Sequence, residues 1–150
     1  MRLVIQRVSR AAVHVAGNTV AEIGPGLLVL VGVGRDDAED EARWLAGKVF
    51  NLRIFEDDEG RMNLALSESG GEILVVPQFT LYGDARRGRR PSWAGAADPN
   101  VAEQRVTAFA ETLEALGATV RRGAFREHME VELVNDGPVT ILLEGSPAGR

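Results

Sequence analysis

The first third of the chain carries short runs of alternating or clustered apolar residues, which predict β-strands. One such run is Ala11–Val15. The pair Gly17-Asn18 then leads into a further run, Thr19–Ile23, an arrangement typical of a β-hairpin. The segment Leu27–Val31 is entirely apolar and predicts a strand that is buried on both faces.

Two later segments change to a period near 3.6 residues, which predicts amphipathic helices. In Asp36–Phe50 the acidic residues gather at the start, where the positive end of the helix dipole favours them. The second segment, Val101–Leu116, is followed by Gly117, a residue type that commonly ends helices. Between the two helices, Gly83–Asn100 has no periodicity, and we expect a loop there.

The remaining apolar runs predict further strands. They are Ile73–Val76, Thr119–Arg121, Met129–Val134 and Val139–Leu143, with Asn135–Pro138 as a turn between the last two. Many strands with two inserted helices favour an α+β fold, in which a barrel-like, mostly antiparallel sheet is packed by two main helices. We expect one domain over residues 1–150, with residues 145–150 as a flexible tail.

Composition narrows the classes of function. The chain of 150 residues has a net charge of −5, which does not suit a generic nucleic-acid binder. Cysteine is absent, which excludes disulfides, thiolate catalysis and cysteine-ligated metals. No apolar run reaches the ~20 residues of a membrane span, and no secretory signal precedes the first strand. We therefore expect a cytoplasmic protein without a membrane partner.

The positive charge is concentrated in one place. Four arginines fall within five positions, at Arg86, Arg87, Arg89 and Arg90. They either form a solvated loop or contact phosphate, because guanidinium groups bind phosphate oxygens in pairs without reading a base sequence. Trp93, just beyond the cluster, is expected to be a packing residue.

Familiar catalytic and cofactor motifs are weak. Gly32-Val33-Gly34 follows a predicted strand, but Asp37 stands where a dinucleotide-binding motif has its third glycine. His14 and His128 have no partners at metal-ligand spacing, so we expect structural or surface roles for both. We expect neither a metal nor a cofactor.

Two short segments are unusual on physical grounds. Pro77-Gln78-Phe79-Thr80-Leu81 closes an apolar strand with a proline and then offers an amide and a hydroxyl beside an aromatic ring. Asn135-Asp136-Gly137-Pro138-Val139-Thr140 contains a Gly-Pro bond, which turns cis at a cost of only ~0.5–1 kcal/mol and can aim two carbonyls into a pocket. Either segment by itself is compatible with an ordinary turn.

Taken together, these segments resemble the D-aminoacyl-tRNA deacylase family, also called D-tyrosyl-tRNA deacylase, from Met1 to about Leu143. The two unusual segments match its signature motifs, Gly88–Trp93 matches its basic loop, and Phe125 and Met129 also fit. The sequence departs from the family at two places. Pro77 replaces the usual serine, and Arg126-Glu127 stands where small residues are common.

The resemblance implies a symmetric homodimer that hydrolyses the ester between a D-amino acid and the 3′-terminal adenosine of tRNA. Gly137 and Pro138 would form a cis bond, enter the partner's pocket and capture the substrate amino group with their carbonyls. An L-amino acid would clash there, so selection works by rejection. Glycine has no side chain to reject and could also be a substrate. Arg7 would orient the Gly-Pro turn.

No general base is evident, and the family is thought to use the 2′-hydroxyl of the RNA. Gln78, Phe79 and Thr80 would then supply backbone N–H donors and pocket contacts, since a threonine without an adjacent base is a poor nucleophile. Pocket support is expected from Pro77, Leu81, Asn135, Thr140, Phe125 and Met129, and tRNA contacts from Arg86, Arg87, Arg89 and Arg90. Two alternatives remain: a non-catalytic tRNA-binding relative on the same scaffold, and a small-molecule-binding dimer without nucleic acid.

Overall fold

One long strand organises the sheet. The computed structural model describes residues 1–145, and its first strand, β1 (Arg2–Val15), pairs antiparallel with three others. The first half of β1 pairs with β3 (Gly26–Gly32) and the second half with β2 (Asn18–Ile23). Its other edge pairs along most of its length with β8 (Glu130–Glu144). Within residues 1–145, no helix is long and apolar enough to cross a membrane.

The sheet continues from β3 through two parallel strands, β6 (Glu72–Pro77) and β7 (Thr119–Arg122). The expected mostly antiparallel sheet is therefore a mixed one. Its two parallel pairings arise because α1 (Glu39–Phe50) and α3 (Pro99–Ala115) lie in the connections and return the chain to the same end of the sheet.

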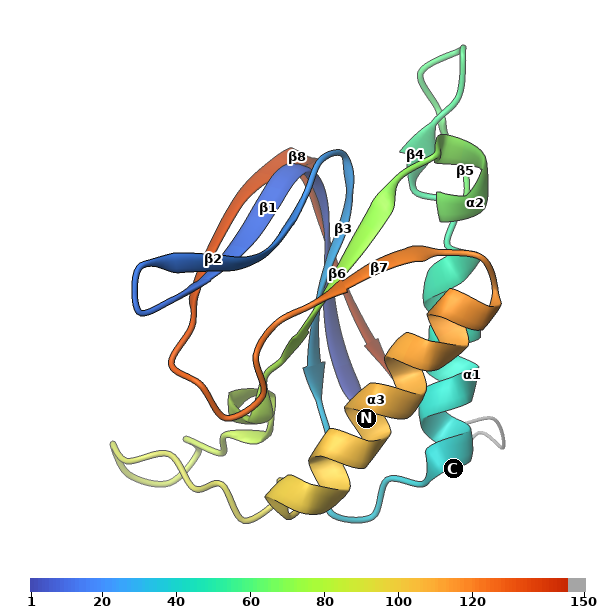
Figure 1. Cartoon of the computed structure of the whole chain (residues 1–150). Helices are drawn as coiled ribbons and strands as arrows, with labels where there is room; N and C mark the ends of the chain where they lie inside the picture. Colours follow the sequence, from blue (N-terminus) through green and yellow to red (C-terminus); the bar gives the residue numbers. More distant parts are fainter. Residues whose placement is uncertain (146–150) are drawn as a thin grey trace.

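The two helices pack side by side on one face of this sheet, which curls so that β2 approaches β6 and β7 (Figure 1). Leu27 and Val29 of β3 point into the core beneath the helices, whereas Leu28 points into a second core enclosed by the curled sheet. Both faces of β3 are thus buried, as the apolar run predicted. The fold confirms the barrel-like sheet with two main helices.

Four short elements were not expected from the pattern. These are β4 (Phe55–Glu56), β5 (Met62–Leu64), the single-turn helix α2 (Leu66–Ser69) and the 3₁₀ turn η1 (Phe79–Tyr82). They contain two to four residues each, too few for any periodic signal. The helix α3 also begins earlier than expected, because Pro99 is well suited to a first helical position.

The expected turn at Asn135–Pro138 is wrong, because β8 is a single strand. Val8 pairs with Asn135 and Gln6 pairs with Thr140, so two steps along β1 face five steps along β8. The three extra residues form a bulge, and pairing with β1 resumes on both sides of it. Of the expected tail, residues 146–150 lie outside the described residues.

The hairpin between β1 and β2 turns at Ala16 and Gly17, one residue earlier than expected. Both have positive φ, 49° and 80°, as a two-residue type I′ turn requires. Ala16 carries a Cβ in this left-handed conformation, which costs a non-glycine residue about 1–2 kcal/mol.

We predict that Ala16→Asn stabilises the protein by about 0.5–1 kcal/mol, because asparagine tolerates the left-handed region better than alanine. Urea denaturation of the two proteins measures this difference. Ala16→Val serves as the control, since a β-branched residue in this conformation should lower the free energy of unfolding. Equal midpoints for all three proteins would contradict the turn geometry.

Candidate functional site

A cavity of about 750 Å³ opens at the carboxyl ends of β3 and β6, next to the start of α3. The carboxyl ends of neighbouring parallel strands lie at the same edge of a sheet, and folds with parallel strands often bind ligands at that edge. The segment between β7 and β8 supplies the opposite wall. The apolar floor is formed by Val31, Val33, Val76, Val106, Met129 and Val131.

The rim of the cavity is charged, whereas its floor is apolar. Charged or titratable side chains at the rim are Arg35, Asp98, Arg126, Glu127 and His128. This combination suits a ligand with a flat apolar body and polar or anionic groups.

Arg126 holds one wall of the cavity in place. It has a positive φ of 65°, its guanidinium donates to the Asn100 Oδ1 at 2.8 Å, and it lies over the Phe125 ring at 5.9 Å. The segment carrying Phe125 and Met129 is thereby tied to the start of α3.

The signature segment at the end of β6 enters the cavity through Pro77, Gln78 and Phe79. The Gln78 N–H donates to the Val31 carbonyl at 2.8 Å, which fixes where η1 begins. Among the described residues, the N–H groups of Phe79 and Thr80 have no acceptor, as is usual at the first positions of a helical turn. Two adjacent donors are thus free beside the cavity.

The Thr80 hydroxyl is already engaged, because it accepts a hydrogen bond from the Gln78 side-chain amide. Phe79 and Trp93 form an edge-to-face pair with ring centroids 5.4 Å apart, and both rings are largely exposed. Gly83 makes room for this pair, since a Cβ there would lie 2.6 Å from the Trp93 ring. Trp93 was expected only to pack, but it also lines the cavity.

The arginine cluster lies at the tip of an exposed loop that leaves η1 and returns to Trp93. Asp84 and Ser92 close this loop with two backbone hydrogen bonds of 2.8 and 2.9 Å. Arg86 pairs with the Asp84 carboxylate at 2.7 Å and lowers the pKa of that carboxyl well below its usual range. Within residues 1–145, no salt-bridge partner is found for the other three, Arg87, Arg89 and Arg90.

The second signature segment forms the bulge of β8, where the Gly137-Pro138 bond is cis. Arg7, only 6% exposed, donates from Nε to the Asp136 carbonyl at 3.0 Å and from Nη1 to the Ile54 carbonyl at 2.8 Å. The Asn135 side-chain amide donates to the carbonyls of Arg7 and Val139 at 3.0 and 2.9 Å. The exposed bulge is therefore braced from both strands.

The structure brings only part of the expected site together. Pro77, Gln78, Phe79, Phe125 and Met129 line the cavity, whereas Thr80 lies next to it on η1. The expected residues that do not line the cavity within this chain are Arg7, Leu81, Asn135, Gly137, Pro138 and Thr140.

Leu81 and Thr140 make contacts elsewhere. The Leu81 Cβ packs where Gly32 leaves room, and the Thr140 hydroxyl accepts a hydrogen bond from the Gln6 amide at 3.2 Å. Of the two histidines, His128 lines the cavity, and His14 binds Thr19 and Glu132 on the outer face of the sheet. The described residues contain no group of three side chains suited to a metal ion.

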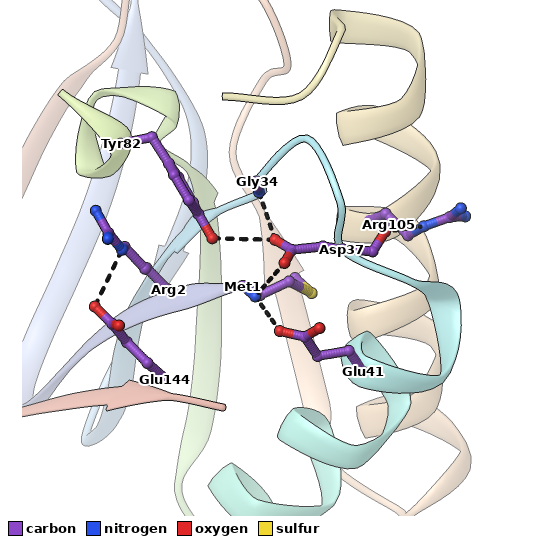
Figure 2. Close-up of polar contacts among 8 residues, drawn as sticks. All are labelled: Met1, Arg2, Gly34, Asp37, Glu41, Tyr82, Arg105 and Glu144. Carbon is purple, nitrogen blue, oxygen red and sulfur yellow. Dashed lines mark hydrogen bonds and ion pairs between the residues drawn. The ribbon is translucent and has the colours of Figure 1, made fainter. Parts of the chain in front are cut away.

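A polar cluster around Asp37, which contacts Tyr82 at the end of η1, was not predicted from the sequence (Figure 2). The Tyr82 hydroxyl donates to Asp37 Oδ2 at 3.1 Å, and the Tyr82 ring lies where Gly34 has no side chain. The Gly32-Val33-Gly34 pattern was a signal for this packing, since a Cβ at Gly34 would come within 2.8 Å of the ring.

The matching family and the relatives compared by sequence are named for the same activity. The family described as "D-Tyr-tRNA(Tyr) deacylase" matches residues 4–144. A D-aminoacyl-tRNA deacylase of Symbiobacterium thermophilum is 58% identical over 96% of this chain and 95% of its own length. One of Thermotoga petrophila is 57% identical, covering 97% of this chain and 98% of its own.

Two solved structures share the fold. The "c-Myc DNA Unwinding Element Binding Protein" superposes with a TM-score of 0.91 at 37% identity, covering 97% of this chain and 99% of its own. A "probable eukaryotic D-amino acid tRNA deacylase" gives a TM-score of 0.80 at 18% identity, covering 95% and 97%. At that identity the second likeness concerns the fold alone.

Proposed function

The chain belongs to the D-Tyr-tRNA(Tyr) deacylase family, and from that premise we propose that it hydrolyses the ester joining a D-amino acid to the 3′-terminal adenosine of tRNA. Glycine is a further expected substrate. The observation that carries the proposal is the pair of free N–H groups at Phe79 and Thr80, beside a cavity with an apolar floor.

In the proposed reaction, the terminal adenosine enters the cavity and stacks near Phe125 and Met129. The N–H groups of Phe79 and Thr80 then stabilise the negative charge that develops on the carbonyl oxygen of the ester as water adds to its carbon. The 2′-hydroxyl of the adenosine assists the attack by water, so the protein's part is to hold the ester in position. Thr80 is not the nucleophile, because its hydroxyl binds Gln78 and has no adjacent base.

Chirality would be selected across the interface of a symmetric homodimer. Gly137 and Pro138 are exposed, rigidly braced through Arg7 and absent from their own chain's cavity. These properties support a role in the partner's site, where their carbonyls would capture the substrate amino group. The side chain of an L-amino acid would meet this bulge, so the site discriminates by exclusion.

The exposed loop of Arg87, Arg89 and Arg90 is proposed to contact tRNA phosphates. Their guanidinium groups, which have no salt-bridge partner within residues 1–145, suit phosphate oxygens, and the loop returns to Trp93, which lines the cavity. A local patch of this kind allows tRNA binding despite the net charge of −5.

The activity is tested by comparing the deacylation rates of D-tyrosyl-tRNA and L-tyrosyl-tRNA, with the protein at a lower concentration than the tRNA. We expect the D ester to be lost at least ~10²-fold faster, a difference of about 2.7 kcal/mol in transition-state stabilisation. Binding of tRNA without loss of either ester would instead identify a non-catalytic relative, with Pro77→Ser as the next variant. Absence of tRNA binding at low salt would favour a small-molecule-binding dimer.

We predict that Gly137→Ala reduces the D-to-L rate ratio at least about tenfold. Gly137 has φ +141°, and an added Cβ would lie 2.7 Å from Val139 Cγ2, so the bulge must shift. Gly60→Ala is the matched control, because Gly60 also has positive φ but open space around it. An unchanged D-to-L rate ratio in Gly137→Ala would show that the bulge does not select the chirality of the amino acid.

Mixed dimers test whether the bulge acts across the interface. Two variants are made that should each lose deacylation as homodimers: Gly137→Trp, whose large side chain should block the pocket that the bulge enters, and Gln78→Trp, whose side chain should fill the cavity. Their subunits are then mixed and reassorted. If the bulge serves the partner's site, each mixed dimer has one intact site and about a quarter of the wild-type activity returns. If it serves its own chain, no activity returns.

For the loop, we predict that the double variant Arg89→Ala with Arg90→Ala weakens tRNA binding and flattens its salt dependence by roughly 1–2 units of log–log slope. The control variant, Arg61→Ala with Arg122→Ala, removes the same charge from two distant ion pairs with Glu59 and Glu114. Equal salt slopes for both double variants would show that the loop does not contact tRNA phosphates.

A further inference from the structure

The end of η1 is held by residues that do not line the cavity, and Figure 2 shows the contact of Tyr82 with Asp37 among them. The Tyr82 hydroxyl donates to Asp37 Oδ2 at 3.1 Å. The Arg2 guanidinium lies 4.6 Å from the centre of the Tyr82 ring and donates from Nη1 to the Leu81 carbonyl at 3.0 Å. Tyr82 and Leu81, the last two residues of η1, are thus fixed by strand β1 and the connection before α1.

Asp37 is itself firmly placed. Its carboxylate accepts a hydrogen bond from the Gly34 N–H and forms an ion pair with the Met1 ammonium at 2.8 Å. The Asp37 side chain is only 14% exposed. The Asp37 carbonyl accepts from Arg105 Nε of α3 at 3.3 Å. Burial, followed by the charge of Asp37, raises the pKa of Tyr82 above its ordinary value, so the hydroxyl stays protonated and able to donate.

The start of η1, next to the cavity, is held by the Gln78 N–H, which donates to the Val31 carbonyl at 2.8 Å. Phe79 is 58% exposed, and its ring forms an edge-to-face pair with Trp93, which is itself 43% exposed. The N–H groups of Phe79 and Thr80 have no acceptor among the described residues. The direction in which these two N–H groups point is therefore set from both ends of the turn, by the Gln78–Val31 hydrogen bond at its start and by the anchored Leu81 and Tyr82 at its end.

We propose that Tyr82 and Asp37 are positioning residues, which aim the Phe79 and Thr80 N–H groups at the reacting ester. This inference rests on the proposed deacylation. Neither side chain lines the cavity, so both act through η1. Because donors that stabilise a transition state must be fixed beforehand, a shift of about 1 Å can cost up to ~10²-fold in rate.

The test combines Tyr82→Phe, which removes only the hydroxyl, with Asp37→Ala and the double variant. For D-tyrosyl-tRNA we expect kcat to fall about tenfold in Tyr82→Phe, with KM within about twofold, because the cavity contacts remain. The double variant should be no slower than Asp37→Ala alone, since both changes break the same hydrogen bond. Glu41→Gln is the control, because Glu41 binds the Met1 ammonium without touching Tyr82.

Hydrogen exchange in the free protein gives a readout that does not depend on activity. The Leu81 and Gly83 amides are bonded to the Gln78 and Thr80 carbonyls within the turn. We expect their exchange to be several-fold faster in Tyr82→Phe and unchanged in Glu41→Gln.

The outcomes are distinct. Unchanged kcat in Tyr82→Phe, a rise in KM alone, or fully additive losses in the double variant would overturn the positioning role. Wild-type protein that hydrolyses neither ester would overturn the proposed function instead, and the exchange rates would then report on the anchor alone.

Discussion

The parallel pairing of β3 with β6 is the constraint on which the candidate site depends. Val31 lies opposite Pro77 at the end of this pairing, so both strands leave the sheet at the same edge. The Val31 carbonyl then accepts a hydrogen bond from the Gln78 N–H, so η1 begins beside the end of β3. The cavity, the free N–H groups and the start of α3 all lie around this edge.

Two rigid units of different origin serve the proposed chemistry. The bulge of β8 owes its rigidity to Arg7, whose buried guanidinium binds two carbonyls on different segments. The turn η1 is held at its start by the Gln78–Val31 hydrogen bond and at its end by Tyr82, which packs where Gly34 has no side chain. In the proposed reaction, neither unit supplies a side-chain nucleophile. Both present backbone groups, which suits a reaction promoted by placement and selected by exclusion.

Charge is distributed to match these roles. The chain is acidic on average, yet the loop beyond η1 presents three arginines without an acidic partner in the described part of the chain. Asp84 neutralises Arg86 at the base of the loop and helps to fix its shape through the Asp84–Ser92 bridge. The positive charge is therefore held at the tip, where a polyanion can reach it.

The sequence alone was sufficient for the local features, because apolar periodicity and turn chemistry depend on neighbouring residues. Both main helices, the buried strand Leu27–Val31 and the two signature segments were identifiable in this way. Features that depend on distant residues were not. The continuity of β8 depends on its pairing with β1, and the meaning of Gly32 and Gly34 depends on Tyr82.

The same distinction applies to the site. Sequence resemblance predicted site roles for several residues, including Gln78, Phe79 and Gly137. Only the tertiary structure placed the first two at the cavity and the third away from it. The reason is physical: a cavity is formed by strand ends, a helix start and a loop that meet only when the chain folds, and hydrogen bonds such as Tyr82 to Asp37 join residues far apart in the sequence.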